Sequence, residues 1–257
     1  MGHVLGWRRA DVLAHPERCV PAAVESAFAE LVARREMSEP VAYLLGEREF
    51  YGRMFKVDRR ALIPRPETEL LVDLGKAAVA RWRESGVEPV VVDVGTGSGA
   101  IAVSLAAESR VRVIATDRSL DALLLARENA SKHMARVNLA VTDLLEGLRG
   151  PLHVVVANLP YVPSGRALPR DVAAYEPPLA LFGGPRGTEL IERLLRDARP
   201  LLAPGAELAL ELDEEDQAQP VAAHARHLYP SAEINVCQDA GGYDRVVRLV
   251  LSSPPAG

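Results

Sequence analysis

The sequence is poor in cysteine and has no long apolar run. Its two cysteines, Cys19 and Cys237, lie far apart and form no CxxC pair, which argues against a zinc site or a disulfide framework and fits a reducing cytoplasm. No apolar run approaches the roughly 20 residues needed to span a bilayer. The opening "MGHVLGWRRADVL" lacks the apolar core of a signal peptide. We therefore expect a cytoplasmic protein with no metal and no membrane partner.

Positive charge is not in excess either, since 30 Lys and Arg stand against 35 Asp and Glu for a net charge of −5. Such a chain has no general attraction to nucleic acid. We expect no direct nucleic-acid partner, although a local basic patch is compatible with the composition. The 257 residues, 48% hydrophobic and 25% charged, fit one large globular domain or a large domain with a small one. We expect a monomer.

The first quarter of the chain predicts helices around a β-hairpin. Apolar residues recur at helical spacing over residues 21–35, and Pro40 closes that segment. The stretch "EREFYGRMFKVD" contains two strand-like pieces around Gly52 and predicts a hairpin. A second helix is expected over residues 67–84, after "IPRP". We therefore divide the chain into a helical unit at 1–45, a β-hairpin linker at 46–66 and a larger domain at 67–257.

From residue 89 onward, β-rich apolar segments alternate with helical ones. Such alternation predicts parallel βαβ units, right-handed crossovers and a doubly wound α/β sheet. The last two segments, "AEINVCQD" and "DRVVRLVL", are separated by "AGGY" and predict an antiparallel hairpin at the sheet edge. The five expected strands before that hairpin cover residues 89–95, 112–117, 136–143, 151–158 and 206–212.

A glycine-rich turn, "DVGTGSGA" at 93–100, joins the first of these strands to its helix. Glycines let the backbone approach a ligand closely, and the helix N-terminus offers free amide donors. The spacing is ambiguous, because Gly95, Gly97 and Ala100 also satisfy the dinucleotide fingerprint GxGxxG/A. A plain tight turn is the alternative, which three glycines within five residues make less attractive.

Carboxylates end the next two strands. Asp117 is placed to accept hydrogen bonds from ribose hydroxyls, and its alternative role is to cap the helix that starts near Ser119. Together with the glycine loop, ribose binding is favoured. Asp143 ends the third strand and is placed to meet an adenine amino group, with a capping or solvated role equally compatible.

The fourth strand delivers "ANLPYVP" (157–163) beside the first, at the edge where open α/β sheets bind ligands. Asn158 offers an acceptor and a donor pair, Pro160 fixes the backbone, and Tyr161 provides a flat π-face. Together they could grip a planar amide or amino group. An Asx-type turn with a core-packed tyrosine explains the bare tetrapeptide equally well.

The loop "GTGSG", the acidic end of the second strand and "NLPY" together resemble S-adenosylmethionine-dependent methyltransferases that modify planar nitrogens, whose motif is often written N-P-P-Y. The stretch at 40–73, which contains "LIPRPETE", is similar to the segment that precedes the catalytic domain in the HemK/PrmC family of release-factor glutamine-N5 methyltransferases. The segments "EPPLALFGG" (176–184) and "DAGGYDR" (239–245) resemble family segments in the same order. The resemblance covers essentially the whole chain.

This resemblance implies a class I, Rossmann-like methyltransferase domain of seven strands with a C-terminal antiparallel hairpin, preceded by a small helical substrate-docking domain. It implies methyl transfer from S-adenosylmethionine to the glutamine of the Gly-Gly-Gln motif in class I peptide release factors, leaving S-adenosylhomocysteine. The implied cofactor-binding residues are Gly95, Thr96, Gly97, Ser98, Gly99, Asp117, Asp143, Leu144 and Asn158. The implied catalytic and substrate-binding residues are Asn158, Leu159, Pro160 and Tyr161, with Arg65 and Glu67 as further substrate contacts.

The sequence departs from the family pattern in two places. Leu159 stands where the family more often has proline, although the backbone carbonyl that would receive the substrate amide is still present. The chain begins abruptly, so the first helices usual for the N-terminal domain are expected to be missing. Arg65 is equally compatible with an ion-paired linker, and Glu67 with the N-terminus of its helix.

Three other functions stay open at this point. An adenine-N6 methyltransferase would suit the same grip, but it predicts a basic groove and a target-recognition insertion. A nicotinamide dehydrogenase would use the glycine loop and leave "NLPY" unexplained. A non-catalytic relative would bind the cofactor without turnover.

Overall fold

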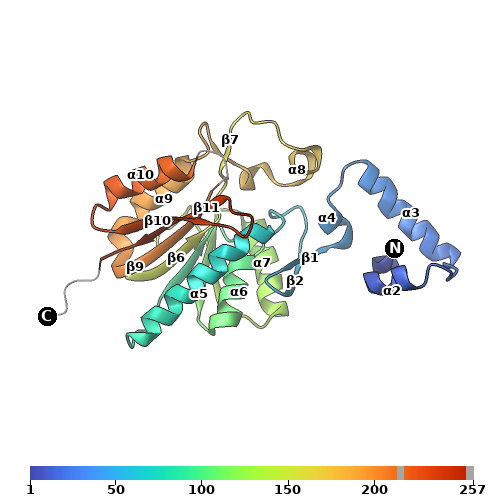
Figure 1. The fold of residues 1–257 in the computed structure, drawn as a ribbon, viewed down its shortest axis with the longest axis horizontal. Coiled ribbons are helices and arrows are strands. Elements are labelled where there is room, and N and C mark those ends of the chain that lie inside the picture. The colour runs from blue at the N-terminus through green and yellow to red at the C-terminus, as the bar shows by residue number, and fades with distance from the viewer. Residues whose placement is uncertain (213–216, 253–257) are drawn as a thin grey trace.

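A seven-stranded mixed sheet forms the body of the computed structural model, which describes residues 1–212 and 217–252 (Figure 1). Five neighbouring strands run parallel, and β11 runs antiparallel between β9 and β10. In spatial order the strands are β10 (Glu233–Gln238), β11 (Asp244–Val250), β9 (Leu202–Glu211), β6 (Leu152–Ala157), β3 (Val91–Val94), β4 (Val113–Asp117) and β5 (Val137–Val141). The predicted α/β class and the antiparallel hairpin at the sheet edge are confirmed.

Helices cover both faces of the sheet, and this explains why the central strands are apolar throughout. Val154 and Val156 of β6 pack into one cluster with α5 (Glu69–Glu84) and α6 (Ala100–Ser109). Val155 and Ala157 point the other way, into a cluster with α9 (Glu189–Ala198) and α10 (Ala218–Leu228). Successive side chains of a strand face opposite sides, so a strand covered on both faces needs a continuous apolar run. Next to α6, α7 (Leu120–Lys132) packs on β4 and β5.

The parallel strands β3, β4, β5 and β6 all end at one edge of the sheet. The loops that follow these strands therefore converge there, and they include the glycine-rich turn and the "NLPY" segment. This convergence places the candidate site at the carboxyl edge of the sheet, as expected for an open α/β fold.

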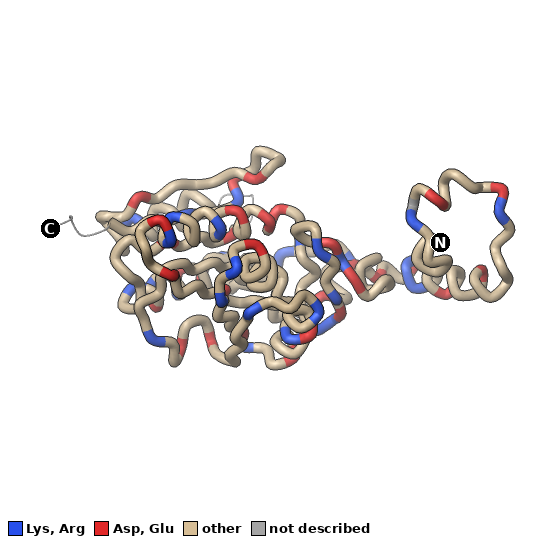
Figure 2. The backbone as a smooth tube through the Cα atoms, turned by 90° about the horizontal axis from the view of Figure 1, so that it is seen from below, with Lys and Arg blue, Asp and Glu red and all other residues tan. Residues whose placement is uncertain are grey.

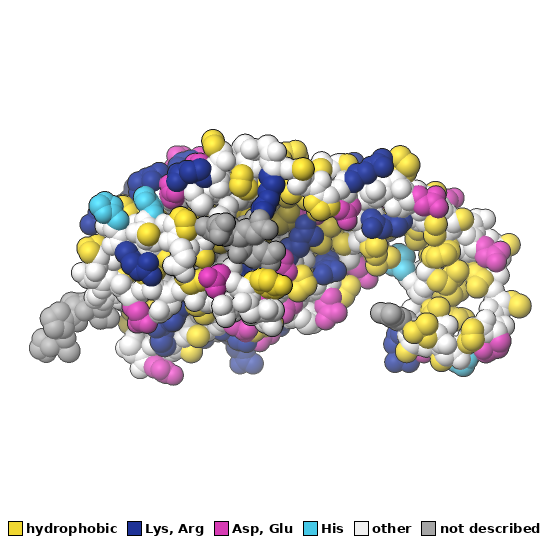
Figure 3. All heavy atoms as spheres, turned by 45° about the horizontal axis from the view of Figure 1, so that its top comes forward, with side chains coloured by type: hydrophobic (Ala, Val, Ile, Leu, Met, Phe, Trp, Pro, Cys, Tyr) yellow, Lys and Arg dark blue, Asp and Glu magenta, His cyan; other side chains and the backbone are white. Residues whose placement is uncertain are grey.

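The N-terminal helices stand apart from this body (Figure 2). The helix expected over 21–35 is present as α3 (Ala22–Glu36), and two short helices that the sequence did not predict, α1 (Gly2–Leu5) and α2 (Arg9–Ala14), precede it. Neither α1 nor α3 contains a buried side chain. Figure 3 shows a hollow between this unit and the body, with hydrophobic side chains gathered on the unit.

A short helix and the predicted hairpin connect the unit to the body. The helix is α4 (Val41–Leu45), and the hairpin pairs β1 (Glu47–Phe50) with β2 (Arg53–Lys56). Tyr51 and Gly52 form its turn with positive φ angles of 51° and 68°, as a two-residue turn between twisted antiparallel strands requires. The hairpin is held to the body by the buried Asn129 of α7, whose Oδ1 accepts a hydrogen bond of 2.8 Å from the Lys56 backbone N–H.

The structure differs from the sequence-based expectation in two further places. Strand β9 begins at Leu202 rather than at 206, because a register shift in its pairing with β6 accommodates Pro204 and Gly205, which read as turn residues in the sequence. The segment after "NLPY" is also more regular than expected. Its elements are β7 (Val162–Pro163), α8 (Arg170–Tyr175) and β8 (Phe182–Gly184).

Two negative observations concern the described residues only. None of their helices is both long and apolar enough to cross a membrane. In the same part of the chain, His, Cys, Asp and Glu form no group of three or more that could hold a metal ion.

Candidate active site

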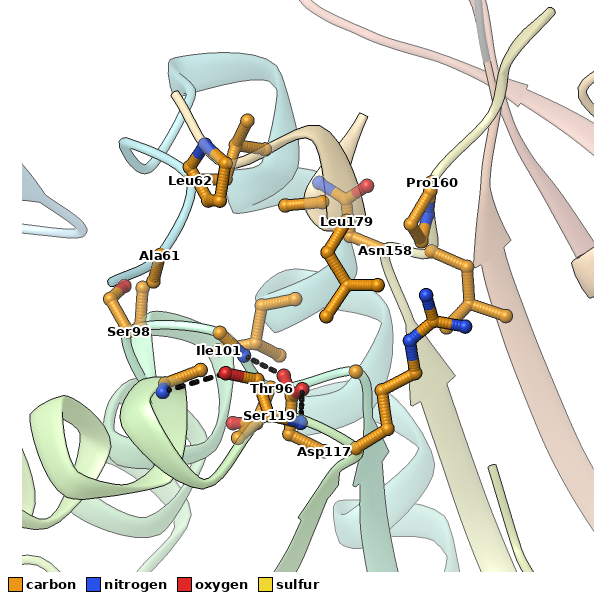
Figure 4. Close-up of a pocket in the computed structure, with 18 of the residues that line it drawn as sticks. Ala61, Leu62, Thr96, Ser98, Ile101, Asp117, Ser119, Asn158, Pro160 and Leu179 are labelled. Carbon is orange, nitrogen blue, oxygen red and sulfur yellow. Dashed lines mark hydrogen bonds between the residues drawn. The ribbon is translucent and has the colours of Figure 1, made fainter. Parts of the chain in front are cut away.

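One cavity lies at the carboxyl edge of the sheet, lined by the residues that follow four parallel strands (Figure 4). Figure 4 shows Thr96 and Asp117 on one side of this space and Leu62, Leu179 and Pro160 on the other. The lining residues at the strand ends are Gly95, Thr96, Gly97 and Ser98 after β3, Asp117 at the end of β4, Asp143 and Leu144 after β5, and Asn158, Leu159 and Pro160 after β6. The wall also includes the linker residues 60–65, and further lining residues are Thr68, Ala100, Ile101, Pro177, Leu179 and Ala180.

The glycine loop is shaped by positive φ angles of 73°, 55° and 82° at Gly95, Gly97 and Gly99. Such angles favour glycine over any residue with a side chain. The backbone N–H groups of Gly95 and Thr96 both donate to the Thr116 carbonyl, at 2.8 and 2.9 Å. Gly99 precedes the first turn of α6, where free amides favour a negatively charged or polar ligand.

Beneath the loop lies Asp93, a buried carboxylate that the sequence analysis did not assign to the site. Its Oδ2 accepts hydrogen bonds from the Thr96 hydroxyl at 2.6 Å and the Ala102 backbone N–H at 3.1 Å. Burial raises the pKa of Asp93 to about 7. Asp93 therefore holds the glycine loop onto the start of α6. Its place directly before the "GTGSG" loop was the available sequence signal.

Asp117 ends β4 and faces the cavity. Its Oδ2 accepts the Gly97 backbone N–H and its Oδ1 accepts the Ser119 backbone N–H, both at 2.9 Å. The helix that follows is capped by Ser119, whose hydroxyl accepts from Ala122 at 3.2 Å, so Asp117 is not its cap. Burial raises the pKa of Asp117. Each carboxylate oxygen has a further lone pair, which leaves Asp117 able to accept ligand hydroxyls.

Asp143 and Leu144 also line the cavity. One oxygen of Asp143 accepts a hydrogen bond of 2.7 Å from the Arg193 guanidinium, and its other oxygen is not used in that bond. Leu144 has a positive φ of 52°, and its carbonyl accepts from the Thr116 hydroxyl at 3.0 Å. The side chain of Leu144 is buried and supplies apolar surface next to Asp143.

Asn158 follows β6 and has its amide fixed on one side. Its Nδ2 donates to Thr68 Oγ1 at 3.0 Å and to Glu211 Oε1 at 2.8 Å. The NH2 group of Asn158 therefore faces these two acceptors, and the acceptor Oδ1 is the atom left for a ligand. Sequence reasoning missed Thr68 and Glu211. The available signals were the position of Thr68 within "LIPRPETE" and the charge of Glu211 within an apolar strand.

The next three residues differ in where they point. Pro160 lines the cavity and Leu159 is buried, with its side chain packed over Gly95. Tyr161 is not among the described residues of the cavity wall, and it packs against the apolar cluster of α9 and α10. The role of Tyr161 as a substrate contact therefore stays a prediction.

Two glycines pack against the backbone of this motif. A Cβ atom on Gly183 would lie 2.1 Å from the Pro160 carbonyl oxygen, and one on Gly187 would lie 2.1 Å from the Tyr161 carbonyl oxygen. No side chain fits at either distance. The "FGGPRG" segment therefore supports the path of the backbone after Asn158.

Arg65 lines the cavity but is already paired. Its Nη2 lies 2.5 Å from Oε1 of the buried Glu176, which matches the alternative of an ion-paired linker. Glu67 is half-buried at the start of the α5 region and lies outside the cavity wall. Contacts of Arg65 and Glu67 with a substrate stay predictions.

The sheet order, the glycine loop, the carboxylate at the end of β4 and the "NLPY" segment, all at one cavity, define a methyltransferase domain. Two family models match the chain: the PrmC N-terminal domain at residues 1–46 and the methyltransferase small domain at residues 69–174. The chain is 42% identical over 252 residues to the release factor glutamine methyltransferase of Moorella thermoacetica, with 94% of this chain and 87% of the relative covered. It is 38% identical over 248 residues to that of Deinococcus radiodurans, with 96% and 87% covered. The chain belongs to the release factor glutamine methyltransferase family.

Solved structures agree with this assignment. A methyltransferase from Pyrococcus furiosus superimposes with a TM-score of 0.60 over 87% of this chain and 99% of that chain. At 17% sequence identity, this superposition shows a common fold and no more. The E. cuniculi complex responsible for the methylation of the eRF1 translation termination factor gives a TM-score of 0.52 at 26% identity, over 75% of this chain and 99% of that chain. The predicted family, fold and enzyme class are thus confirmed.

Proposed function

We propose that this protein transfers a methyl group from S-adenosylmethionine to the side-chain amide nitrogen, N5, of the glutamine in the Gly-Gly-Gln motif of class I peptide release factors. S-adenosylhomocysteine is the second product. The observation that supports this most directly is that Asn158, Leu159 and the glycine loop line one cavity in a chain whose relatives are release factor glutamine methyltransferases.

The cavity wall fits the proposed cofactor. Apolar side chains such as Ile101 and Leu144 suit an adenine ring, Asp117 suits ribose hydroxyls, and the loop from Gly95 to Ser98 suits the methionine end. Gly99 is outside the described lining, and its role in cofactor binding stays a prediction. Asp143 retains one oxygen for the adenine amino group. When bound, S-adenosylmethionine supplies a methyl group on a positively charged sulfur.

Asn158 and Leu159 would orient the substrate amide. An amide nitrogen is a poor nucleophile because its lone pair is delocalised into the carbonyl. If Asn158 Oδ1 and the Leu159 carbonyl accept its two N–H bonds, electron density shifts back to nitrogen without prior removal of a proton. Two fixed acceptors also hold the nitrogen at the distance and angle that transfer requires, so positioning and electrostatics supply the rate.

The helical unit at 1–45 would hold the release factor, with residues 46–66 as linker and 67–257 as the catalytic domain, whose last residues lie outside the described part of the chain. The match of the PrmC N-terminal domain to residues 1–46 and the hollow beside this unit (Figure 3) support that division. A release factor substrate implies the cytoplasm as the site of action. A monomeric state stays a prediction.

The test is mass spectrometry of an unmodified class I release factor after incubation with the protein and S-adenosylmethionine. We expect one added methyl group on the Gly-Gly-Gln glutamine, and none with Asn158→Ala. Methylation of adenine in an RNA or DNA probe instead would favour the nucleic-acid alternative. Calorimetric binding of S-adenosylmethionine without methylation would favour a non-catalytic relative.

A further inference from the structure

Thr68, Asn158 and Glu211 form a closed hydrogen-bonded triangle at the cavity wall, which Thr68 and Asn158 line. Besides accepting from Asn158, Thr68 Oγ1 donates to Glu211 Oε1 at 3.1 Å. Thr68 and Glu211 are both buried, with exposed fractions of 4% and 0%. The three residues come from the start of α5, the end of β6 and the end of β9, so the fold brings them together from distant parts of the chain.

Thr68 ends a 3-10 turn (Pro66–Thr68) that runs into α5, and its own backbone is helical, with φ −66° and ψ −15°. Its hydroxyl makes no capping bond to the first turn of α5. The hydroxyl bonds to Asn158 and Glu211 instead, so this side chain joins α5 to the residues that follow β6 and end β9.

Glu211 is also unusual when compared with Glu207 on the same strand. Glu207 is buried between the guanidinium groups of Arg81 and Arg248, with an Arg248 Nε–Glu207 Oε1 distance of 2.5 Å. Within the described residues Glu211 has no such ion pair, and its Oε2, like that of Glu207, has no hydrogen-bond partner. An uncompensated buried carboxyl group is costly, and such groups concentrate at functional sites.

We propose that Thr68 and Glu211 are positioning residues for the methylation, which hold the Asn158 amide with its oxygen, rather than its NH2 group, available to the substrate. This inference rests on the proposed function. Thr68 gives its only hydroxyl proton to Glu211 Oε1, so both oxygens face Nδ2 as acceptors, and a turned amide would point its oxygen at another oxygen. Without these partners the amide can turn, and a donor then faces the donor N–H of the substrate glutamine.

The kinetic test uses two variants that remove the partners, Thr68→Val and Glu211→Leu. We expect kcat for release factor methylation to fall about 10- to 100-fold, while the Kd for S-adenosylmethionine, measured by calorimetry, changes less than about threefold. Thr68→Ser keeps the hydroxyl and should retain kcat. Glu207→Gln is the matched control, because Glu207 is a buried glutamate of the same strand. This variant should lower the thermal midpoint and leave kcat unchanged. A kcat equal to that of the wild type in both Thr68→Val and Glu211→Leu would overturn the proposal. The proposal would also be wrong if kcat fell in proportion to the thermal midpoint in all variants, Glu207→Gln included.

A second readout does not depend on the substrate. The chain has four asparagines, Asn129, Asn138, Asn158 and Asn235, so selective 15N labelling gives four side-chain amide signals, and Asn158→Ala identifies the relevant one. Because the half-buried Asn158 NH2 group donates to two buried side chains, its protons should exchange slowly with water and become fast in Thr68→Val. If wild-type protein fails to methylate the release factor but shows this change, the positioning holds and the proposed substrate is wrong. Unchanged exchange would overturn the positioning itself.

Discussion

Arg65 of the linker and Glu176 of the segment after "NLPY" form an ion pair at 2.5 Å, although 111 positions separate them in the chain. The second oxygen of Glu176 accepts the Ile63 backbone N–H at 3.0 Å. Glu176 directly precedes Pro177, which is part of the outer wall of the cavity. One buried carboxylate therefore fastens two segments of that wall together.

Glu176→Gln should weaken this wall. It removes the charge that pairs with Arg65, and we expect the free energy of unfolding to fall by about 1–3 kcal/mol, less than for a fully buried pair because Arg65 is partly exposed. The Kd for S-adenosylmethionine should rise, since residues 63–65 and Pro177 line the same cavity. Urea unfolding and calorimetry measure the two effects. Glu88→Gln, which removes the exposed pair with Arg83, should change neither quantity, and equal effects of both variants would contradict this role of Glu176.

Gly95 and Leu159 should show strong coupling. A Cβ atom on Gly95 would lie 2.8 Å from Leu159 Cδ2, and the φ of 73° adds strain for alanine. Leu159→Ala should lower the free energy of unfolding by about 2–4 kcal/mol through the cavity it leaves. The double variant should lose less than the sum of Gly95→Ala and Leu159→Ala, because the clash disappears with the leucine. Additive losses in chemical unfolding would show that the contact is unimportant.

Asn129 should link the hairpin to the glycine loop. Its Nδ2 donates to the Lys56 carbonyl at 3.0 Å and to the Ser98 carbonyl at 2.9 Å. Asn129→Ala leaves the buried Ser98 carbonyl and the partly buried Lys56 backbone groups without this partner, so we expect a loss of about 2–3 kcal/mol in the free energy of unfolding and a higher Kd for S-adenosylmethionine. Asn138 is exposed, and Asn138→Ala serves as the control. A stable variant with unchanged cofactor binding would refute the link.

Glu211 should make stability depend on pH. Burial, with a smaller contribution from the Glu67 charge, raises its pKa from 4.5 to about 8, while the Thr68 and Asn158 hydrogen bonds and the Arg245 charge act in the opposite direction. Between these two pH values the folded protein holds a proton that the unfolded chain has lost, so ionisation costs the folded state increasingly as pH rises.

Glu211→Gln removes that cost. Relative to this variant, the wild type should lose stability as pH rises from about 4.5 to 8, by on the order of a few kcal/mol, with no further change above that range. Urea unfolding of both proteins at pH 5 and pH 8.5 measures the difference. A difference that is the same at both pH values would show that Glu211 titrates normally.

The elements with a strong periodicity could be predicted from local sequence patterns. The run "PLHVVVA" predicts β6 because a strand covered on both faces is apolar throughout. The glycine loop and Asp117 could be assigned to one site because parallel strands place their carboxyl ends at a common edge. The hairpin around Gly52 followed from two strand-like pieces and a turn residue.

The supporting contacts could not be predicted in this way. Asn158 meets Thr68 across 90 positions and Glu211 across 53, and no local pattern encodes such a pairing. Tyr161 packs against an apolar cluster that includes residues of α9 and α10, and the tetrapeptide alone does not encode that contact. A charged residue within an apolar strand, such as Glu211, is the sequence signal that points to such a supporting contact.

The lack of buried side chains in α1 and α3 has a consequence for molecular recognition. Helices without a core of their own open at a low free energy, so their amides should show little protection from hydrogen exchange compared with those of β3 or β6. When a protein binds these helices and orders them, its contacts must offset the conformational entropy that the helices lose. If the release factor binds this unit, as proposed, its affinity is lowered by the free energy needed to order the first 36 residues.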